Sequence, residues 1–181
     1  MQAAVRIIGI DPGLRTTGWG VIESCGADIA YIGSGGIRPD ERKPVAERLR
    51  ELHEHLAAVI REYRPDEAAV EETFINRNPQ SALKLGQARA IALVVPALAG
   101  ITVAEYAANL IKKTLTGTGH AEKTQIAMMA SMLLPGSGLQ RSDAADALAV
   151  AITHARVRPW ARNLESAGNL IHKGGGVEQK F

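Results

Sequence analysis

Residues 5–24 read VRIIGIDPGLRTTGWGVIES and determine how the fold begins. Apolar stretches at residues 5–10 and 18–24 predict two strands, and the Asp-Pro-Gly signal at residues 11–13 predicts the turn that joins them. A third strand-like stretch spans residues 29–37 and follows the turn signal Gly-Ala-Asp. We therefore expect these three segments to pair as an antiparallel meander.

Helices and strands alternate along the rest of the chain. Apolar residues recur at steps of three and four between Pro44 and Pro65, which predicts an amphipathic helix over residues 45–63. Short buried strands are expected at residues 67–72 and 101–105. Helices are expected at residues 81–99, where Pro96 would bend or end the helix, and at residues 108–115, 122–134 and 143–156. This order predicts an α/β fold, a mixed sheet of about five strands flanked by helices on both faces.

The length of 181 residues fits one domain with a single sizeable core. No charged-then-apolar leader opens the chain and no uninterrupted apolar run of about 18 residues is visible, so we expect a cytoplasmic protein with no membrane contact. Cys25 is the only cysteine and cannot form an internal disulfide; on a strand, it is expected to be a packing residue. We expect one domain over residues 1–158, and a mobile C-terminal tail over the glycine-rich, polar residues 159–181.

Charge is distributed unevenly along the chain although the net charge is only +2. Residues 1–75 hold 9 Lys and Arg against 13 Asp and Glu, whereas residues 76–181 hold 12 against 6. An acidic site beside a basic remainder suits a nuclease, although solvated helix faces produce such counts just as often.

Four carboxylates stand at the ends of apolar segments that would bring them together. Asp11 ends the first strand, Asp143 and Asp146 share one face of a helix, and Glu71 or Glu72 ends the strand at 67–72. Periodicity cannot choose between the two glutamates. Taken singly, Asp11 is typical of a turn, and the aspartate pair is typical of a helix start that complements the helix dipole.

A cluster of carboxylates on rigid elements favours bound cations. Two carboxylates 4 Å apart repel by about 4 kcal/mol at an effective dielectric constant near 20. Oxygen ligands suit Mg²⁺, with Mn²⁺ as a substitute. Two such ions can activate a water and stabilise the leaving 3′ oxygen, which leaves 5′-phosphate and 3′-hydroxyl ends. The hypothesis is a metal-dependent nuclease with two ions per active site.

Several motifs together resemble one known family. GIDPGLRTTGWGVI, AVEETF, SALKLGQARA, AEKTQ and SDAADALAVAITHA occur in the order and spacing of the RuvC family of Holliday-junction resolvases, over about residues 5–156. The resemblance implies a ribonuclease H-like fold and a Mg²⁺-dependent endonuclease that resolves four-way DNA junctions by paired symmetric nicks. It also implies that the metal ligands are Asp11, Glu71, Asp143 and Asp146, which decides between Glu71 and Glu72.

Further residues and partners follow from the same resemblance. Lys112 and Lys123 match family lysines needed for activity, and Phe74 matches an aromatic residue that inserts at the junction centre. Without the resemblance, these lysines would be ordinary surface residues and Phe74 a core residue. The family also implies a homodimer and the RuvA-RuvB branch-migration complex as partner. Apart from the resemblance, we expect phosphate contacts along the DNA arms from Arg77, Lys84 and Arg89, although their spacing alone indicates only a solvated helix face.

Two other functions compete with this one. GIDPGLRTTGWGVI also resembles the phosphate-binding hairpin of actin-like and sugar kinases, but those proteins need two such lobes and this chain has room for one. A non-catalytic junction-binding module is the second alternative, against which the four intact carboxylates argue.

Overall fold

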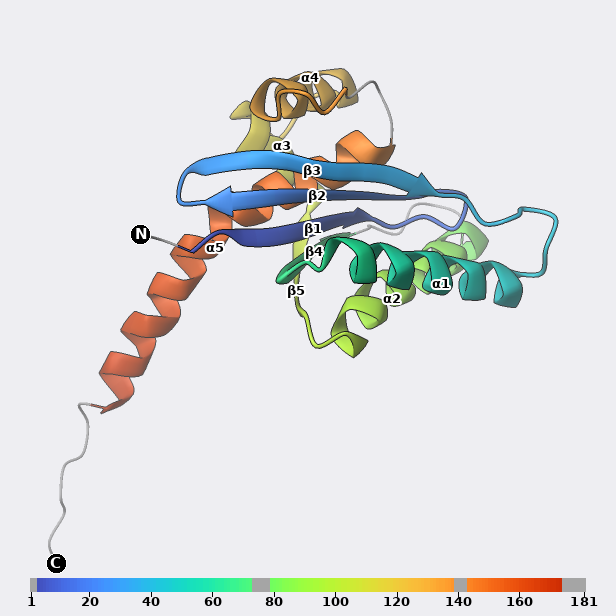
Figure 1. Ribbon diagram of the computed structural model, residues 1–181, viewed down its shortest axis with the longest axis horizontal. Helices are drawn as coiled ribbons and strands as arrows, with labels where there is room; N and C mark the ends of the chain where they lie inside the picture. Colours follow the sequence, from blue (N-terminus) through green and yellow to red (C-terminus); the bar gives the residue numbers. More distant parts are fainter. Residues whose placement is uncertain (1–2, 73–78, 139–142, 174–181) are drawn as a thin grey trace, which may run out of the picture.

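A five-stranded mixed sheet forms the centre of the fold (Figure 1). The computed structural model describes residues 3–72, 79–138 and 143–173. Strands β1 (Val5–Asp11), β2 (Thr17–Cys25) and β3 (Asp28–Ile37) pair antiparallel, as predicted for the meander. Strands β4 (Glu67–Glu72) and β5 (Thr102–Ala107) extend the sheet parallel to β1, in the order β3-β2-β1-β4-β5.

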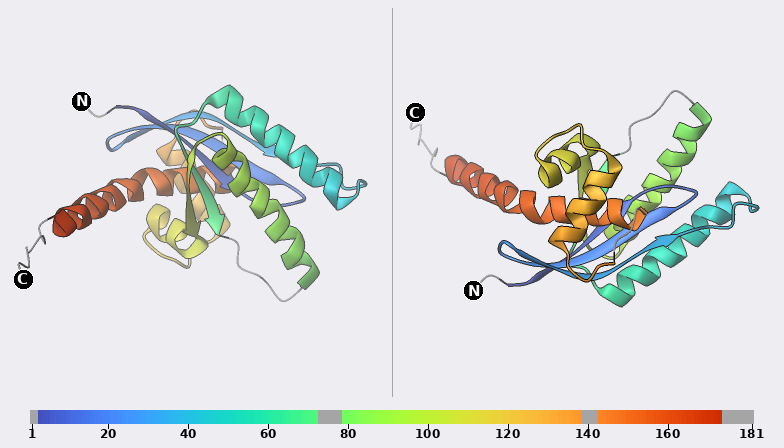
Figure 2. Two further views of the ribbon diagram at one scale, coloured as in Figure 1. Left: turned by 90° about the horizontal axis from the view of Figure 1, so that it is seen from below. Right: turned by 90° about the horizontal axis from the view of Figure 1, so that it is seen from above.

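Helices cover both faces of this sheet, as predicted (Figure 2). Helices α1 (Val45–Tyr63) and α2 (Pro79–Leu98) pack on one face. Helices α3 (Ala108–Thr116), α4 (Lys123–Leu133) and α5 (Asp143–Lys173) belong to the other. Successive side chains of a strand point to opposite faces of the sheet. Ile7 therefore packs in the hydrophobic core between the sheet and α5, and Ile8 packs in the core between the sheet and α1.

The boundaries of α1 and α2 follow from local chemistry. Helix α1 has the predicted bounds and ends where Arg64 adopts a left-handed conformation with φ 47°, directly before Pro65. Pro96 lies inside α2, which ends two residues later at Leu98. The carbonyl of Pro96 then accepts the backbone N–H of Ile101 at 3.0 Å, so the chain turns at once into β5.

Two predictions about local structure are wrong. Helix α5 continues to Lys173, 17 residues beyond the predicted end at residue 156 (Figure 1). Proline lacks an N–H but accepts a helical φ, and residues 160–173 contain a single glycine, so Pro159 does not end the helix. The described part of the expected tail is thus helical, and the division of the chain at residue 158 stays a prediction. Cys25 is exposed at the last position of β2 rather than packed in the core.

Helix α2 is unusual because it is apolar but poorly covered. By length and composition alone it could cross a membrane, although only 22% of its 18-residue apolar window is buried. Such a helix is weak evidence for a membrane span, since core helices of soluble proteins meet the same criteria.

Candidate active site

The site begins with Asp11, the last residue of the central strand β1. A tight turn fixes the backbone just after it. The hydroxyl of the fully buried Thr17 donates to the carbonyl of Gly13 at 2.8 Å and accepts the Gly13 N–H at 3.2 Å. Asp11 is therefore held at the end of the central strand, which is paired on both sides and followed by a closed turn.

Glu71 lies near the same end of the neighbouring strand β4. Strands β1 and β4 are parallel, and Ile10 lies opposite Val70, so Asp11 and Glu71 follow at adjacent positions. Both carboxylates line one cavity of about 220 Å³. Glu72 does not line it. The structure thus resolves the ambiguity left by periodicity and places Glu71 beside Asp11.

Helix α5 brings Asp146 over these strand ends because glycines let it approach closely. A β-carbon on Gly18 would stand 2.1 Å from the carbonyl oxygen of Asp143, and one on Gly9 would stand 2.1 Å from that of Ala147. The first turn of α5 therefore rests directly on β1 and β2. Asp146, one turn into the helix, lines the cavity with the two strand carboxylates.

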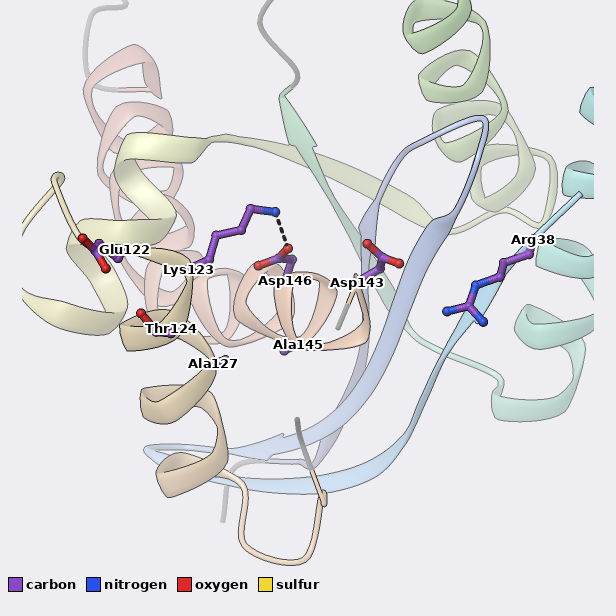
Figure 3. Close-up of a pocket in the computed structure, with 8 residues that line it drawn as sticks. All are labelled: Arg38, Glu122, Lys123, Thr124, Ala127, Asp143, Ala145 and Asp146. Atoms are coloured by element: carbon purple, nitrogen blue, oxygen red, sulfur yellow. Dashed lines mark hydrogen bonds and ion pairs between the residues drawn. The ribbon is translucent and has the colours of Figure 1, made fainter. Parts of the chain in front are cut away.

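Two lysines face this acidic cavity from α3 and α4. Lys123, the first residue of α4, donates from Nζ to Oδ2 of Asp146 at 2.9 Å (Figure 3). Lys112, on α3, is half-buried and lines the same cavity. The cavity therefore collects three carboxylates and two ammonium groups from five different elements.

The electrostatics of the site are unfavourable to the ionised carboxylates. Burial, followed by the negative charges of Glu71 and Asp146, raises the pKa of Asp11 to about 7 against the opposing effect of Lys123. Burial and Asp146 likewise raise the pKa of Glu71, while Lys123 and Lys112 lower it. The hydrogen bond to Asp146 raises the pKa of Lys123, so its ammonium charge is stabilised here. The cavity thus favours a positive charge among its carboxylates.

Asp143 lies apart from the other three carboxylates. It borders a neighbouring cavity of about 560 Å³ that it shares with Asp146, Lys123 and Thr124. Arg38, just after β3, lies on the far side of this cavity from Lys123 (Figure 3). Asp143 therefore occupies a peripheral position, and its charge is the smallest contributor to the raised pKa of Asp11.

The residues expected to bind DNA are placed differently from one another. Lys84 is exposed and lines a third cavity, of about 540 Å³, that also reaches Asp143. Arg89 is less suited than expected, because its guanidinium forms an ion pair with Glu105 of β5. Phe74 and Arg77 lie outside the described residues.

The donor chemistry fits a hard divalent cation, since the cavity carboxylates offer only oxygen atoms. Within the described ranges, however, no three His, Cys, Asp or Glu side chains lie close enough to bind one ion together. The Nζ of Lys123 is the positive group that contacts Asp146 in this arrangement. Side-chain movement would therefore be needed for three of these residues to bind one ion together.

Three residues that shape the site were not predicted from the sequence. Thr17 closes the turn after Asp11, Gly18 admits the first turn of α5, and Arg38 faces Asp143. The glycines of the second strand hinted at a close backbone approach, but the partner, α5, lies more than 120 residues away in the chain. No sequence signal singles out Thr17 or Arg38.

This sheet order, with acidic residues at the ends of two adjacent parallel strands and on the helix across them, defines the ribonuclease H-like class. The family model described as crossover junction endodeoxyribonuclease RuvC matches residues 7–154. The chain therefore belongs to the RuvC family.

Relatives and solved structures agree with this assignment. RuvC of Beijerinckia indica is 62% identical over 158 residues, covering 87% of this chain and 90% of the relative. RuvC of Methylocella silvestris is 61% identical over 169 residues, covering 93% and 96%. The structure of T. thermophilus RuvC in complex with a Holliday junction substrate has a TM-score of 0.77 and 34% identity, covering 83% of this chain and 93% of that one. The yeast mitochondrial resolvase Ydc2, with a TM-score of 0.64 and 11% identity, shares the fold.

Proposed function

We propose that this endonuclease resolves four-way DNA junctions by paired symmetric nicks that depend on Mg²⁺. The observation that carries the proposal is the cavity in which Asp11, Glu71 and Asp146 converge beside Lys112 and Lys123. A matching relative of known structure was solved with a Holliday junction substrate, which supports the choice of DNA.

Asp11, Glu71 and Asp146 would hold the metal, with Asp143 as a peripheral ligand. When bound, Mg²⁺ supplies Lewis-acid stabilisation and activates a water for in-line attack, and Mn²⁺ can take its place. Asp11 would be the ligand shared by two ions, because Glu71 follows at the adjacent strand position and the charges of Glu71 and Asp146 both act on Asp11. The raised pKa values of Asp11 and Glu71 support cation binding, because a cation would offset both the burial of these charges and the repulsion between them.

The two lysines would act on the phosphate rather than on the metal. Lys112 lines the cavity wall with a positive charge that stabilises the charge developing on the phosphate in the transition state. Lys123, 82% exposed, would move from Asp146 to the phosphate as the carboxylate turns to the metal. Both lysines are thus catalytic candidates in the sense that they contact the reacting group.

DNA contacts extend from this cavity along the neighbouring surface. Lys84 lines the cavity next to Asp143 and would bind a backbone phosphate. We also propose Arg77 and Arg89 as phosphate contacts and Phe74 as a ring that stacks on bases at the junction centre. Arg89 would have to leave Glu105 to bind phosphate, so we rank its contribution below that of Lys84.

A second copy of the chain is proposed to cover α2. Its apolar residues Leu83, Val94 and Leu98 are 66%, 46% and 75% exposed, which a homodimer would bury. Two opposed nicks in one junction also need two active sites related by a two-fold axis. The RuvA-RuvB branch-migration complex is the proposed partner of this dimer, in the cytoplasm.

A non-catalytic junction-binding module is the main alternative. A phosphate-binding lobe of the actin or sugar-kinase type is less supported, because Asp146, which α5 brings into the acidic cavity, would have no function in such a lobe. Either alternative predicts no strand cleavage by the purified protein.

The decisive experiment is incubation of an end-labelled synthetic four-way junction with and without Mg²⁺. The expected products are nicks at symmetric positions in two opposing strands, sealable by DNA ligase. A linear duplex of one arm serves as the substrate control, and Asp146→Asn as the protein control. Binding of the junction without Mg²⁺-dependent nicks would favour the binding-module alternative.

A further inference from the structure

A third cavity beside the site has the opposite electrostatic character from the other two. It measures about 540 Å³ and lies between the turn after β1, the start of α1 and the start of α2. Its charged lining consists of Arg15, Arg48 and Lys84 against Glu41 and Asp143, so cations outnumber carboxylates. In the two cavities nearer the metal-binding carboxylates, acidic residues outnumber basic ones.

Arg48 is fixed in this cavity by the backbone that follows Asp11. Its Nη2 donates to the carbonyl oxygen of Leu14 at 2.8 Å. Its Nε is buried and has no hydrogen-bond partner among the described residues. The guanidinium is therefore held beside the cavity as a fixed positive charge, which favours an anionic ligand.

Arg15 is held only weakly and can exchange its partner. Its Nε contacts Oε1 of Glu41 at 2.9 Å, but the two side chains are 86% and 58% exposed. An exposed ion pair contributes little stability, because water solvates both charges and salt screens them. A phosphate entering the cavity can therefore replace Glu41 as the partner of Arg15.

We propose, on the basis of the proposed function, that this cavity binds a backbone phosphate of the strand being cut. Asp143 borders both this cavity and the one shared with Asp146, so the bound phosphate lies close along the strand to the one at the acidic centre. Arg15 makes the contact by leaving Glu41, and Arg48 adds a fixed positive charge. The subsite sets the path of the strand into the active site.

The chain offers a matched control for this test. Arg50 and Glu54 on α1 also form an exposed ion pair, at 2.7 Å with exposures of 59% and 54%, and neither lines the cavity. The variants Arg15→Gln and Glu41→Gln are compared with Arg50→Gln and Glu54→Gln. Each is titrated against a fluorescently labelled four-way junction in EDTA over a range of salt concentrations, so that cleavage does not interfere.

Substitution of Arg15 and substitution of Glu41 should change the affinity for the junction in opposite directions. Arg15→Gln should weaken binding by about fivefold and make the salt dependence shallower by about 0.9 in log-log slope, whereas Glu41→Gln should tighten binding by about twofold. Equal affinities and salt slopes for Arg15→Gln and Arg50→Gln would overturn the subsite. If the wild-type protein still cuts the junction with Mg²⁺, the proposed function survives that result; if it neither binds nor cuts, both fail.

Discussion

Replacing Asp11 by asparagine should make the metal-free protein more stable at neutral and alkaline pH, even though it removes a proposed metal ligand. Folding raises the pKa of Asp11 from 3.8 to about 7, mainly by burial and by the charge of Glu71. Below pH 3.8 Asp11 carries its proton in both the folded and the unfolded state, so it does not lower the free energy of unfolding. Between pH 3.8 and about 7 the unfolded state loses the proton first, so the free energy of unfolding falls as the pH rises.

The size of the effect follows from that shift. Three pH units at 1.36 kcal/mol each correspond to about 4 kcal/mol, fully expressed above pH 7. Asparagine keeps nearly the same shape but cannot ionise. The free energy of unfolding of Asp11→Asn should therefore exceed that of the wild type by up to about 4 kcal/mol at pH 8, and by almost nothing at pH 4.

Urea denaturation followed by circular dichroism, in EDTA at pH 4, 6 and 8, measures this difference. Asp28→Asn, at the exposed start of β3, is the control for the loss of one surface carboxylate. Added Mg²⁺ should stabilise the wild type at pH 8 and have a much smaller effect on Asp11→Asn, because binding to the folded state is linked to stability. Equal stability of the two proteins at pH 8, or a less stable mutant, would refute the electrostatic reasoning.

Four further substitutions, one of them with its own control, test separate parts of the site. Glu71→Gln should slow cleavage at least about 100-fold with junction affinity nearly unchanged. Asp143→Asn, at the margin of the site, should slow cleavage by only about tenfold. Equal losses of cleavage rate in the two variants would contradict the peripheral placement of Asp143. Lys112→Ala should lower the single-turnover cleavage rate more than it lowers affinity, and the reverse result would move it to the DNA-binding surface. Gly18→Ala must displace the start of α5 and should cost about 1–3 kcal/mol of stability together with cleavage activity, whereas Gly119→Ala, whose β-carbon would meet only the carbonyl oxygen of Asn109 at 3.8 Å, should cost neither.

Local patterns predicted most of the scaffold because the signals lie within single elements. The three-and-four spacing of apolar residues gave α1 with its observed bounds, and the turn signals separated β1, β2 and β3. The end of α5 was missed because a proline is compatible with a helix when the residues after it favour one. Cys25 was misplaced because burial at a strand end depends on what covers that end.

The site was harder to predict because its geometry depends on contacts between distant segments. Asp11 and Glu71 could each be placed at a strand end, but only the parallel register of β1 and β4 puts them side by side. The ion pair between Lys123 and Asp146 depends on how α4 lies across α5, for which the sequence holds no local signal. The different positions of Asp143 and Asp146, three residues apart, likewise arise from packing against β2.

The unfavourable charge cluster persists because the elements that carry it cannot relax. Strand β1 is paired on both sides, which holds the backbone of Asp11. Two turns beyond Asp146, helix α5 is tied to β4, where Nε2 of His154 lies 2.8 Å from Oε2 of Glu67 and Nη1 of Arg158 donates to Oε1 of the same residue at 3.2 Å. Separation of the carboxylates would break these contacts and the two hydrophobic cores beside them. Proton uptake, an ammonium group or a metal ion can relieve the repulsion at lower cost, and only the metal ion also activates water. The rigidity of the scaffold therefore supports the proposal that the site binds a cation.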